Sequence, residues 1–556
     1  MRRLIFLFAL AALLCFPLLA PAEGPDSPKS SVASDDHGDL VLKAMLAELK
    51  RSEDNLKLGN LQRPYYIDYE VTDLQDYVAD ATLGALRTDN SNVGRLVRVV
   101  VRIGDYKQDS YFGEGTGSLE VMPIENNELA LRRQLWLATD KAYKAALSGY
   151  TQKQAALKSV ETESDLPDFS KEDTVQSVHD LANLDVDLEQ WKQIVRHTSD
   201  LFRSDPRLED SDALFHFRVL NRYFVNTEGT VTRRGKAVYN FAFEGSTQAA
   251  DGMRIDRSHG YVVTRADELP KPEQIEKDAR DLIATFPELV KAPLIEDDYH
   301  GPVLFSADAS TSLFERLLAR NVLGIRPDLG NPARTTGDFA SYYKSRVLPD
   351  FLTVVDDPHA KKMDGLTPAG NYDVDDEGVE AHPVTVIDKG TLVNYLVDRE
   401  PIRDFPHSNG HGRTALAGAP RPQISNLIIK AGNGISFDDL KQKLIQMCKD
   451  QGRPYGYYVE SMLNGRDTPR LLWRVYANDG HMELVRGAVF NQLDTRALRS
   501  DIIAAGNDRY VYNRAEPLPS SIVAPSLLFD DLELQRANHA REKLPSYPAP
   551  ALTAAK

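Results

Sequence analysis

The chain has 556 residues, of which 42% are hydrophobic and 27% charged, and its formal net charge at pH 7 is −16. This composition is ordinary for a globular protein, and the length suits about two or three domains. The acidic balance argues against a nucleic-acid partner and against binding to anionic membrane surfaces.

The first residues have the pattern of a targeting segment. The basic pair Arg2-Arg3 precedes an apolar run from Leu4 to Leu19, and Ala20-Pro21-Ala22 forms a small-residue cleavage site. We therefore expect residues 1–22 to be a signal peptide and the chain to be exported, most simply to the periplasm and alternatively to the medium. An uncleaved anchor is the competing interpretation, but this run holds about 16 residues and a spanning helix needs about 20. No transmembrane segment is expected after removal of the signal.

We expect an α+β fold that is divided along the chain. A flexible lead over residues 23–39 is indicated by its Pro, Ser, Asp and Gly content, and a disordered tail over 536–556 by the lack of periodicity. Between them we expect a mixed α/β domain over 40–295 and a strand-rich domain over 298–535. The mature chain keeps one cysteine, Cys448, so no intramolecular disulfide is expected.

Hydrophobic spacing predicts the elements of the first half. Helices are predicted by one-sided apolar stripes from Leu40, over 127–160 and over 274–291, and a further helix by the spacing of Leu188, Trp191, Ile194 and Val195. Apolar and polar residues alternate over 65–71 and 97–103, as in strands with one buried face. The segment Asn226-Thr227-Glu228-Gly229-Thr230 predicts a turn between two further strands.

The second half opens with a strand, a polar turn and a helix. Residues 302–305 form the apolar strand, and Ser306, Asp308 and Ser310 are alternative N-caps for the helix. The helical stripe consists of Leu313, Phe314, Leu317, Leu318 and Val322.

Short strands dominate residues 350–535. Asp388-Lys389-Gly390 and Asn478-Asp479-Gly480 are turn signals between apolar runs, and residues 438–449 carry the clearest helical pattern. Cys448 falls on the apolar side of that helix, where a buried structural role is expected. The pattern is typical of an antiparallel sheet or a partly closed barrel.

Several pieces of this second half, in order, resemble the TldD/PmbA family of metallopeptidase-like proteins. The pieces are Asp375-Asp376-Glu377-Gly378, Asp388-Lys389-Gly390-Thr391-Leu392, Ser408-Asn409-Gly410-His411-Gly412-Arg413, Pro422-Gln423-Ile424-Ser425-Asn426-Leu427, Gly456-Tyr457-Tyr458-Val459 and Pro519 to Leu534. The resemblance implies that both domains have the family's fold.

The same resemblance identifies a candidate site. Active family members carry His-Glu-x-x-x-His in the helix after the opening strand, where two His bind zinc and the Glu polarises a water. The matching residues here are Phe314-Glu315-Arg316-Leu317-Leu318-Ala319, so only Glu315 keeps its type. The phenyl ring of Phe314 and the methyl of Ala319 cannot bind a metal. The family's third ligand is a Cys before the terminal strand, and residues 506–514 contain neither Cys nor His.

Zinc, the cofactor of active members, is therefore not expected in this chain. The resemblance implies a metal-less subunit that binds peptides or unfolded polypeptide, in a homo-oligomer or in a hetero-oligomer with a TldD-like zinc subunit. Glu315 is the one candidate catalytic residue, and a structural role as a surface or salt-bridged residue is the simpler interpretation. The alternatives are an active metallopeptidase with a rearranged site and a periplasmic binding or structural module.

Other metal-ligating residue types were weighed as substitutes. His407 and His411 are four residues apart, but the turn residues between them argue against a helical pair. Asp356, Asp357 and His359, with His382 further on, form another loose cluster. The run 375–377 is expected to be a solvated turn because it lacks the spacing of a calcium loop.

Overall fold

A computed structural model describes residues 39–57, 62–160, 165–416, 418–463 and 465–538, together with Leu544, Pro545, Tyr547 and Pro550. The expected signal peptide, nearly all of the flexible lead and most of the tail lie outside the described residues. From Leu40 onward the chain forms one compact unit, and the α+β class is confirmed by its content of helices and sheets.

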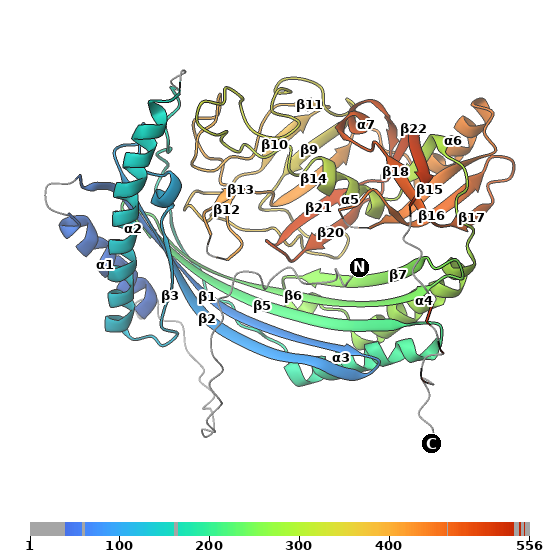
Figure 1. Cartoon of the computed structure of the whole chain (residues 1–556), viewed down its shortest axis with the longest axis horizontal. Coiled ribbons are helices and arrows are strands. Elements are labelled where there is room, and N and C mark those ends of the chain that lie inside the picture. Colours follow the sequence, from blue (N-terminus) through green and yellow to red (C-terminus); the bar gives the residue numbers. More distant parts are fainter. Residues whose placement is uncertain are drawn as a thin grey trace. The chain divides into compact units, whose positions relative to one another are not determined.

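One long, curved sheet forms the N-terminal half (Figure 1). Its strand order is β3-β2-β1-β5-β6-β4, and β7 pairs with β6. The strands are β1 (Pro64–Thr82), β2 (Ala85–Ile103), β3 (Ser118–Val121), β4 (Gln176–Val178), β5 (Asp210–Asn226), β6 (Val231–Gln248) and β7 (Arg254–Val263). Neighbouring strands are antiparallel except β4 and β6, and the predicted turn at 226–230 joins β5 to β6.

Helices cover the apolar face of this sheet at its two ends. The four predicted helices are present as α1 (Leu40–Asn55), α2 (Glu128–Leu157), α3 (Leu188–Leu201) and α4 (Pro272–Lys291). Asn127 caps α2 by accepting the N–H of Ala130. Helices α1 and α2 share a core with β1 and β2, whereas α3 and α4 pack on the aromatic residues of β5 and β6.

The polar face of the sheet is buried as well. In β1, Tyr69 and Val71 point toward the helices, while Glu70 and Thr72 alternate with them on the opposite face. Glu70 is nevertheless only 2% exposed, and the Thr72 hydroxyl donates to the carbonyl of Leu416, 3.3 Å away. The alternation correctly predicted strands, but the face expected to be solvated lies against the C-terminal half.

The C-terminal strands form two larger sheets and a small ribbon. The first sheet runs β11 (Thr391–Leu392), β10 (Val384–Asp388), β9 (Leu352–Asp356), β14 (Asn426–Ala431), β21 (Ser520–Ala524) and β20 (Tyr510–Arg514). The second runs β17 (Met482–Val485), β16 (Pro469–Tyr476), β15 (Tyr455–Met462), β8 (Tyr299–Phe305), β22 (Leu527–Arg536) and β18 (Ala488–Asn491), with β19 (Ile502–Ala505) beside β22. The ribbon pairs β12 (Gly412–Arg413) with β13 (Arg421–Pro422).

These sheets are mixed, where an antiparallel sheet or partial barrel was expected. Strand β14 is parallel to β21, and β15 is parallel to β8. Helix α6 (Phe437–Asp450) connects β14 of the first sheet to β15 of the second. The two predicted turns fall between β10 and β11 and between β16 and β17. Cys448 on α6 is fully buried, and burial raises the pKa of its thiol to about 11.

Helix α5 (Ala307–Leu317) follows β8, and the remaining helix α7 (Thr495–Ser500) is short. Ser306 is the N-cap of α5, since its side chain accepts the N–H of Ala309 at 3.0 Å. The helix ends earlier than the apolar stripe, which was expected to continue to Val322. Within the described residues, no helix is long and apolar enough to cross a membrane.

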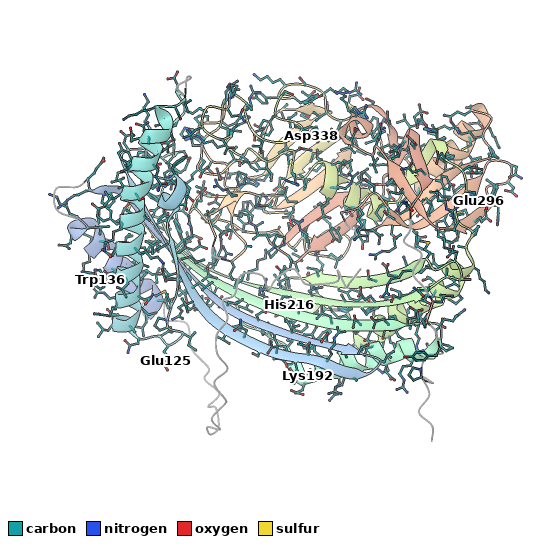
Figure 2. The ribbon with its side chains drawn as sticks, viewed as in Figure 1. Glu125, Trp136, Lys192, His216, Glu296 and Asp338 are labelled. Atoms are coloured by element: carbon teal, nitrogen blue, oxygen red, sulfur yellow. The ribbon has the colours of Figure 1, made fainter. Side chains whose placement is uncertain are left out.

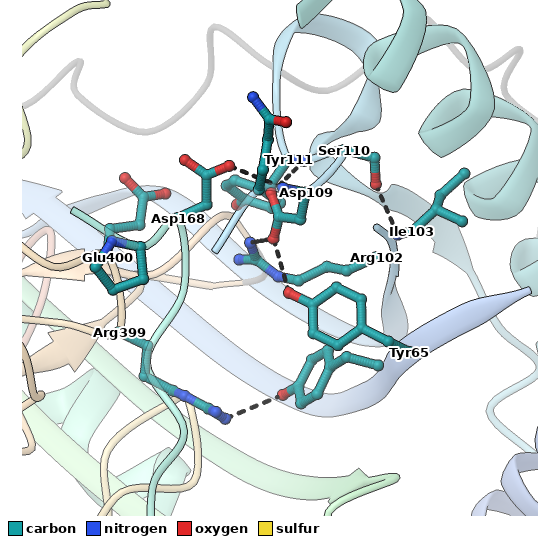
Figure 3. A network of polar contacts seen from close by, with 12 residues as sticks. Tyr65, Arg102, Ile103, Asp109, Ser110, Tyr111, Asp168, Arg399 and Glu400 are labelled. Carbon is teal, nitrogen blue, oxygen red and sulfur yellow. Dashed lines mark hydrogen bonds and ion pairs between the residues drawn. The ribbon is translucent and has the colours of Figure 1, made fainter. Parts of the chain in front are cut away.

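Buried charges connect the two halves at the α2 end of the long sheet (Figure 3). Arg102 of β2 pairs with Asp109 at 2.7 Å, and the Tyr65 hydroxyl donates to the same carboxylate at 2.9 Å. From the C-terminal half, Arg399 pairs with Glu228 at 2.8 Å, and their side chains are 1% and 9% exposed. The Arg399 guanidinium also lies 3.9 Å from the centre of the Phe169 ring. Arg399 thereby ties the C-terminal half to the β5–β6 turn.

Replacing Arg399 with methionine should therefore destabilise the protein strongly. The change leaves the buried Glu228 without its counter-ion, which costs about 3–5 kcal/mol in comparable sites. Denaturant unfolding monitored by circular dichroism should show a clear fall in midpoint. The matched control is Arg496→Met, because the side chain of Arg496 is 66% exposed beside Asp494 and such pairs contribute about 0–1 kcal/mol. Equal midpoints for the two variants would contradict the proposed connection.

Candidate functional site

Glu315 lies on the face of α5 that packs against β20 and β21. Its carboxylate forms an ion pair with Arg514 of β20, with Oε1 and Nη1 2.8 Å apart. Arg514 Nε also donates to the Ser520 hydroxyl of β21 at 3.2 Å. Burial, followed by the charge of Glu315, raises the pKa of Tyr512 on the same strand to about 12. The candidate catalytic carboxylate is therefore held by a guanidinium, as the salt-bridged interpretation predicted.

The two neighbouring motif positions belong to the hydrophobic core. Phe314 and Ala319 are 0% and 8% exposed and lie in the core cluster of the C-terminal half. The N–H groups of Leu318 and Ala319 both donate to the Phe314 carbonyl, at 2.9 and 3.0 Å. The second bond spans five residues, so α5 ends in a wide π-type turn. This turn draws position 319 back toward position 314, although neither side chain has a metal-binding atom.

These residues do not fit a catalytic zinc. Such a site uses about three protein ligands with N, O or S donor atoms, whereas the motif positions offer one carboxylate beside a cation. In the part of the chain that the structure describes, no group of three or more His, Cys, Asp or Glu side chains is arranged to hold a metal ion. We derive no chemistry through zinc here.

A cavity of about 490 Å³ lies between the long sheet and the C-terminal half. His216 of β5, which lines it, projects from the middle of the sheet (Figure 2). The segment 515–519, which connects β20 to β21, forms part of the opposite wall. Since Arg514 and Ser520 flank that segment, the cavity adjoins the Glu315 site through one short connection.

Ion pairs across the wall of this cavity join the two halves. Arg222 of β5 lies 2.7 Å from Asp376 and 3.1 Å from Glu70. Arg234 of β6 also pairs with Asp376, and Arg218 pairs with Glu516. Burial opposes ionisation of Asp376, but Arg222 and Arg234 outweigh it and hold the pKa of this carboxyl below its ordinary value.

The carboxylate run at 375–377 is thus not a solvated turn, and that prediction was wrong. Asp375 and Asp376 are 1% and 4% exposed. The carboxylate of Asp375 accepts N–H groups from Glu377, Val379 and Gly412, each at 2.9 Å. The sequence signal for this pairing is the set of arginines on the polar side of β5 and β6, whose partners are distant in sequence.

The histidine pair considered from the sequence does not converge. His411 is fully buried, and its Nε2 lies 3.1 Å from Asp356. His407 is an exposed loop residue near Glu172, at 3.6 Å. The His359 ring lies 3.7 Å from Asp373, and the His359 backbone N–H donates to Asp357 at 2.9 Å. These histidines serve as separate polar contacts.

Glu70, the partner of Arg222 behind the cavity wall, gives a pH-dependent test of these ion pairs. Burial has the largest effect on the pKa of its carboxyl and raises it. Arg222 lowers this pKa, Asp376 raises it further, and the result is about 7. The native carboxyl then keeps its proton to about pH 7, whereas the unfolded chain loses it near 4.5. Between these values the native state binds more protons, so its stability falls as pH rises.

Glu70→Gln should remove this dependence, because the amide resembles the protonated acid and does not titrate. As the pH rises from 4.5 to 7, the unfolding free energy of the wild type should fall relative to that of Glu70→Gln, by at most about 3 kcal/mol. Urea unfolding across this pH range measures the difference. Glu70→Leu controls for packing, since it should show the same slope with a different offset. A difference that is flat with pH would contradict the assignment.

Comparison with known proteins agrees with the fold and the motif pieces. A sequence model of the PmbA/TldA metallopeptidase C-terminal domain matches residues 298–536. The metalloprotease PmbA of Escherichia coli O157:H7 is 26% identical over 233 residues, which are 42% of this chain and 44% of PmbA. A metalloprotease of Methanocaldococcus jannaschii is 36% identical over 96 residues, which are 17% of this chain and 20% of the relative. The matched segments thus span less than half of the length of either relative.

The likeness in fold extends further along the chain. The crystal structure of TldE from Thermococcus kodakarensis superimposes with a TM-score of 0.59 and 14% identity, covering 88% of this chain and 99% of TldE. At this identity the likeness concerns the fold. Residues 298–536 thus match the C-terminal domain of the TldD/PmbA family, and the fold of most of the chain is similar to that of TldE.

Proposed function

We propose that this chain is an exported, metal-less member of the TldD/PmbA family that binds peptides or unfolded polypeptide and does not hydrolyse them. The observation that carries the proposal is the 2.8 Å ion pair between Glu315 and Arg514. In the family motif this Glu polarises a zinc-bound water, and a guanidinium now occupies its carboxylate. A base must have its proton acceptor free within reach of water or substrate.

Packing supports the same conclusion. Phe314 places a ring in the core where the motif has a ligand, and Ala319 places a methyl there. An active metallopeptidase with a rearranged site, the alternative function, would need donor atoms in their place. The cavity beside this site has a volume of about 490 Å³, which lies within the range of about 300–1,000 Å³ that is common for ligand pockets.

The partner that we propose is inferred from the similar proteins. PmbA is described as a metalloprotease, and TldE is a neighbour in fold. We propose that this chain assembles with a TldD-like zinc subunit or with further copies of itself, in the periplasm. Apolar side chains exposed on β3 and on α2, including Val121 and Leu129, are suited to such an interface. Trp136 of α2 is a further one (Figure 2). A binding or structural module without a peptide role is the remaining alternative.

Metal analysis and a cleavage assay test the proposal together. Protein purified without an affinity tag should contain well under one zinc per chain by plasma mass spectrometry, even after incubation with zinc. It should bind an unstructured polypeptide in a pull-down and leave it intact, with or without a chelator. Stoichiometric zinc together with chelator-sensitive cleavage would favour the active enzyme, and absence of polypeptide binding would favour the structural module.

Rebuilding the ligand set tests the assignment of the motif. Because the π-type turn keeps positions 314 and 319 close, the triple variant Phe314→His, Ala319→His, Arg514→Cys should gain about one zinc per chain. The control is the same double histidine variant with Arg514 retained, which should bind zinc much more weakly because the cation stays beside Glu315. Thermal melts establish that each variant folds. A folded triple variant without zinc would show that these positions do not correspond to the family's ligands.

A further inference from the structure

The wall of the cavity carries positive charge that the described residues do not neutralise. Arg218, Arg222 and Arg234 each have a carboxylate partner. Lys236 of β6 instead donates to the carbonyls of Ala369 and Asn371, at 2.5 and 2.8 Å.

Arg413 of β12 is the second such cation. Its Nη1 donates to the carbonyls of Ile424 and Pro519, both at 3.3 Å, and its guanidinium lies 4.4 Å from the centre of the Tyr372 ring. In the described part of the chain, neither Arg413 nor Lys236 forms an ion pair with a carboxylate.

Their environment favours an added anion. Burial, and then the neighbouring Arg413 and Arg234, lower the pKa of Lys236 well below its usual value. Burial also lowers the pKa of Arg413. Each of these charges is thus held in a site that disfavours it, and a carboxylate between them would offset both the desolvation and the mutual repulsion.

The other residues that line the cavity indicate the chemistry of the rest of the ligand. Leu220, Val238, Pro517 and Leu518 line the same cavity, so an apolar body would be in contact with them. Asp376 also lines the wall, and it would repel a second negative charge on the ligand. A singly charged carboxylate therefore fits better than a phosphate dianion.

We propose that this cavity binds the C-terminal carboxylate of a short, apolar peptide, with Lys236 and Arg413 facing the carboxylate. The inference rests on the proposed function, because it specifies which end of a bound polypeptide this chain holds. The volume of about 490 Å³ admits the last few residues of a peptide and excludes a folded domain. The segment 515–519 places this end of the peptide next to the Glu315 site.

Calorimetry with matched ligands on the full-length mature protein tests the inference. The ligands are N-acetylated trialanine with a free carboxylate, the same peptide as its C-terminal amide, hexanoate and inorganic phosphate. The free acid should bind at least tenfold more tightly than the amide. Lys236→Met should weaken binding of the acid about tenfold and leave the amide unchanged, and Arg413→Gln should act in the same direction.

Control variants separate charge from folding. Lys430→Met removes an exposed lysine of β14 that does not line the cavity, and it should leave every affinity unchanged. If Lys236→Met fails to fold, Lys236→Arg and Arg413→Lys keep the charge and should bind the acid within a few-fold of the wild type.

The outcomes distinguish the two proposals. Equal affinity for acid and amide would overturn the carboxylate site and leave peptide binding standing. Binding of hexanoate but of neither peptide, with loss in Lys236→Met, would support the carboxylate site and count against a peptide function. Tighter binding of phosphate than of any carboxylate, or no binding of any carboxylate, would overturn the inference.

Discussion

The structure depends on burying the polar face of a long sheet against the other half of the chain. Strands with alternating residues usually keep one face in water, where charges are well solvated. Here Glu70, Arg222 and Arg102 are all buried on that face, so each needs a partner from elsewhere in the fold. Asp376 from the C-terminal half provides one for Arg222 at 2.7 Å. The two halves are thereby aligned by charge pairing as well as by apolar packing.

This constraint explains where the cavity lies. The cavity lies between the curved sheet and the C-terminal half, and its lining combines charged side chains with apolar ones such as Leu220 and Leu518. The ion pairs of Arg218 with Glu516 and of Arg222 with Asp376 join the two sides of the cavity. Lys236 instead donates to carbonyl oxygens. A ligand that entered this cavity would meet arginines whose positions are already set by these ion pairs, which would lower the cost of organising them.

Much of the local structure could be predicted because its determinants are local. The periodicity of α2, the Ser306 cap and the turns at 388–390 and 478–480 each depend on residues within a few positions. The mixed sheets could not be read in the same way, since parallel pairing of β8 with β15 joins segments about 150 residues apart. The cavity could not be predicted from the sequence for a similar reason. Arg222, Asp376 and Arg413 become neighbours only when the halves assemble, and a run such as 375–377 looks solvated when considered alone.

The candidate site follows from chemistry at single positions, so the sequence was more informative there. A phenyl ring or a methyl cannot replace imidazole as a ligand whatever the fold does. The sequence could not predict the ion-pair partner of Glu315, because Arg514 is almost 200 residues away. A carboxylate at a half-buried position needs a cation to offset its desolvation. Arg514 meets that need, and Phe314 fills the adjoining volume with hydrocarbon. Changing one of these positions alone would leave either an uncompensated charge or a cavity, so Glu315, Phe314 and Arg514 are best understood as one coupled arrangement.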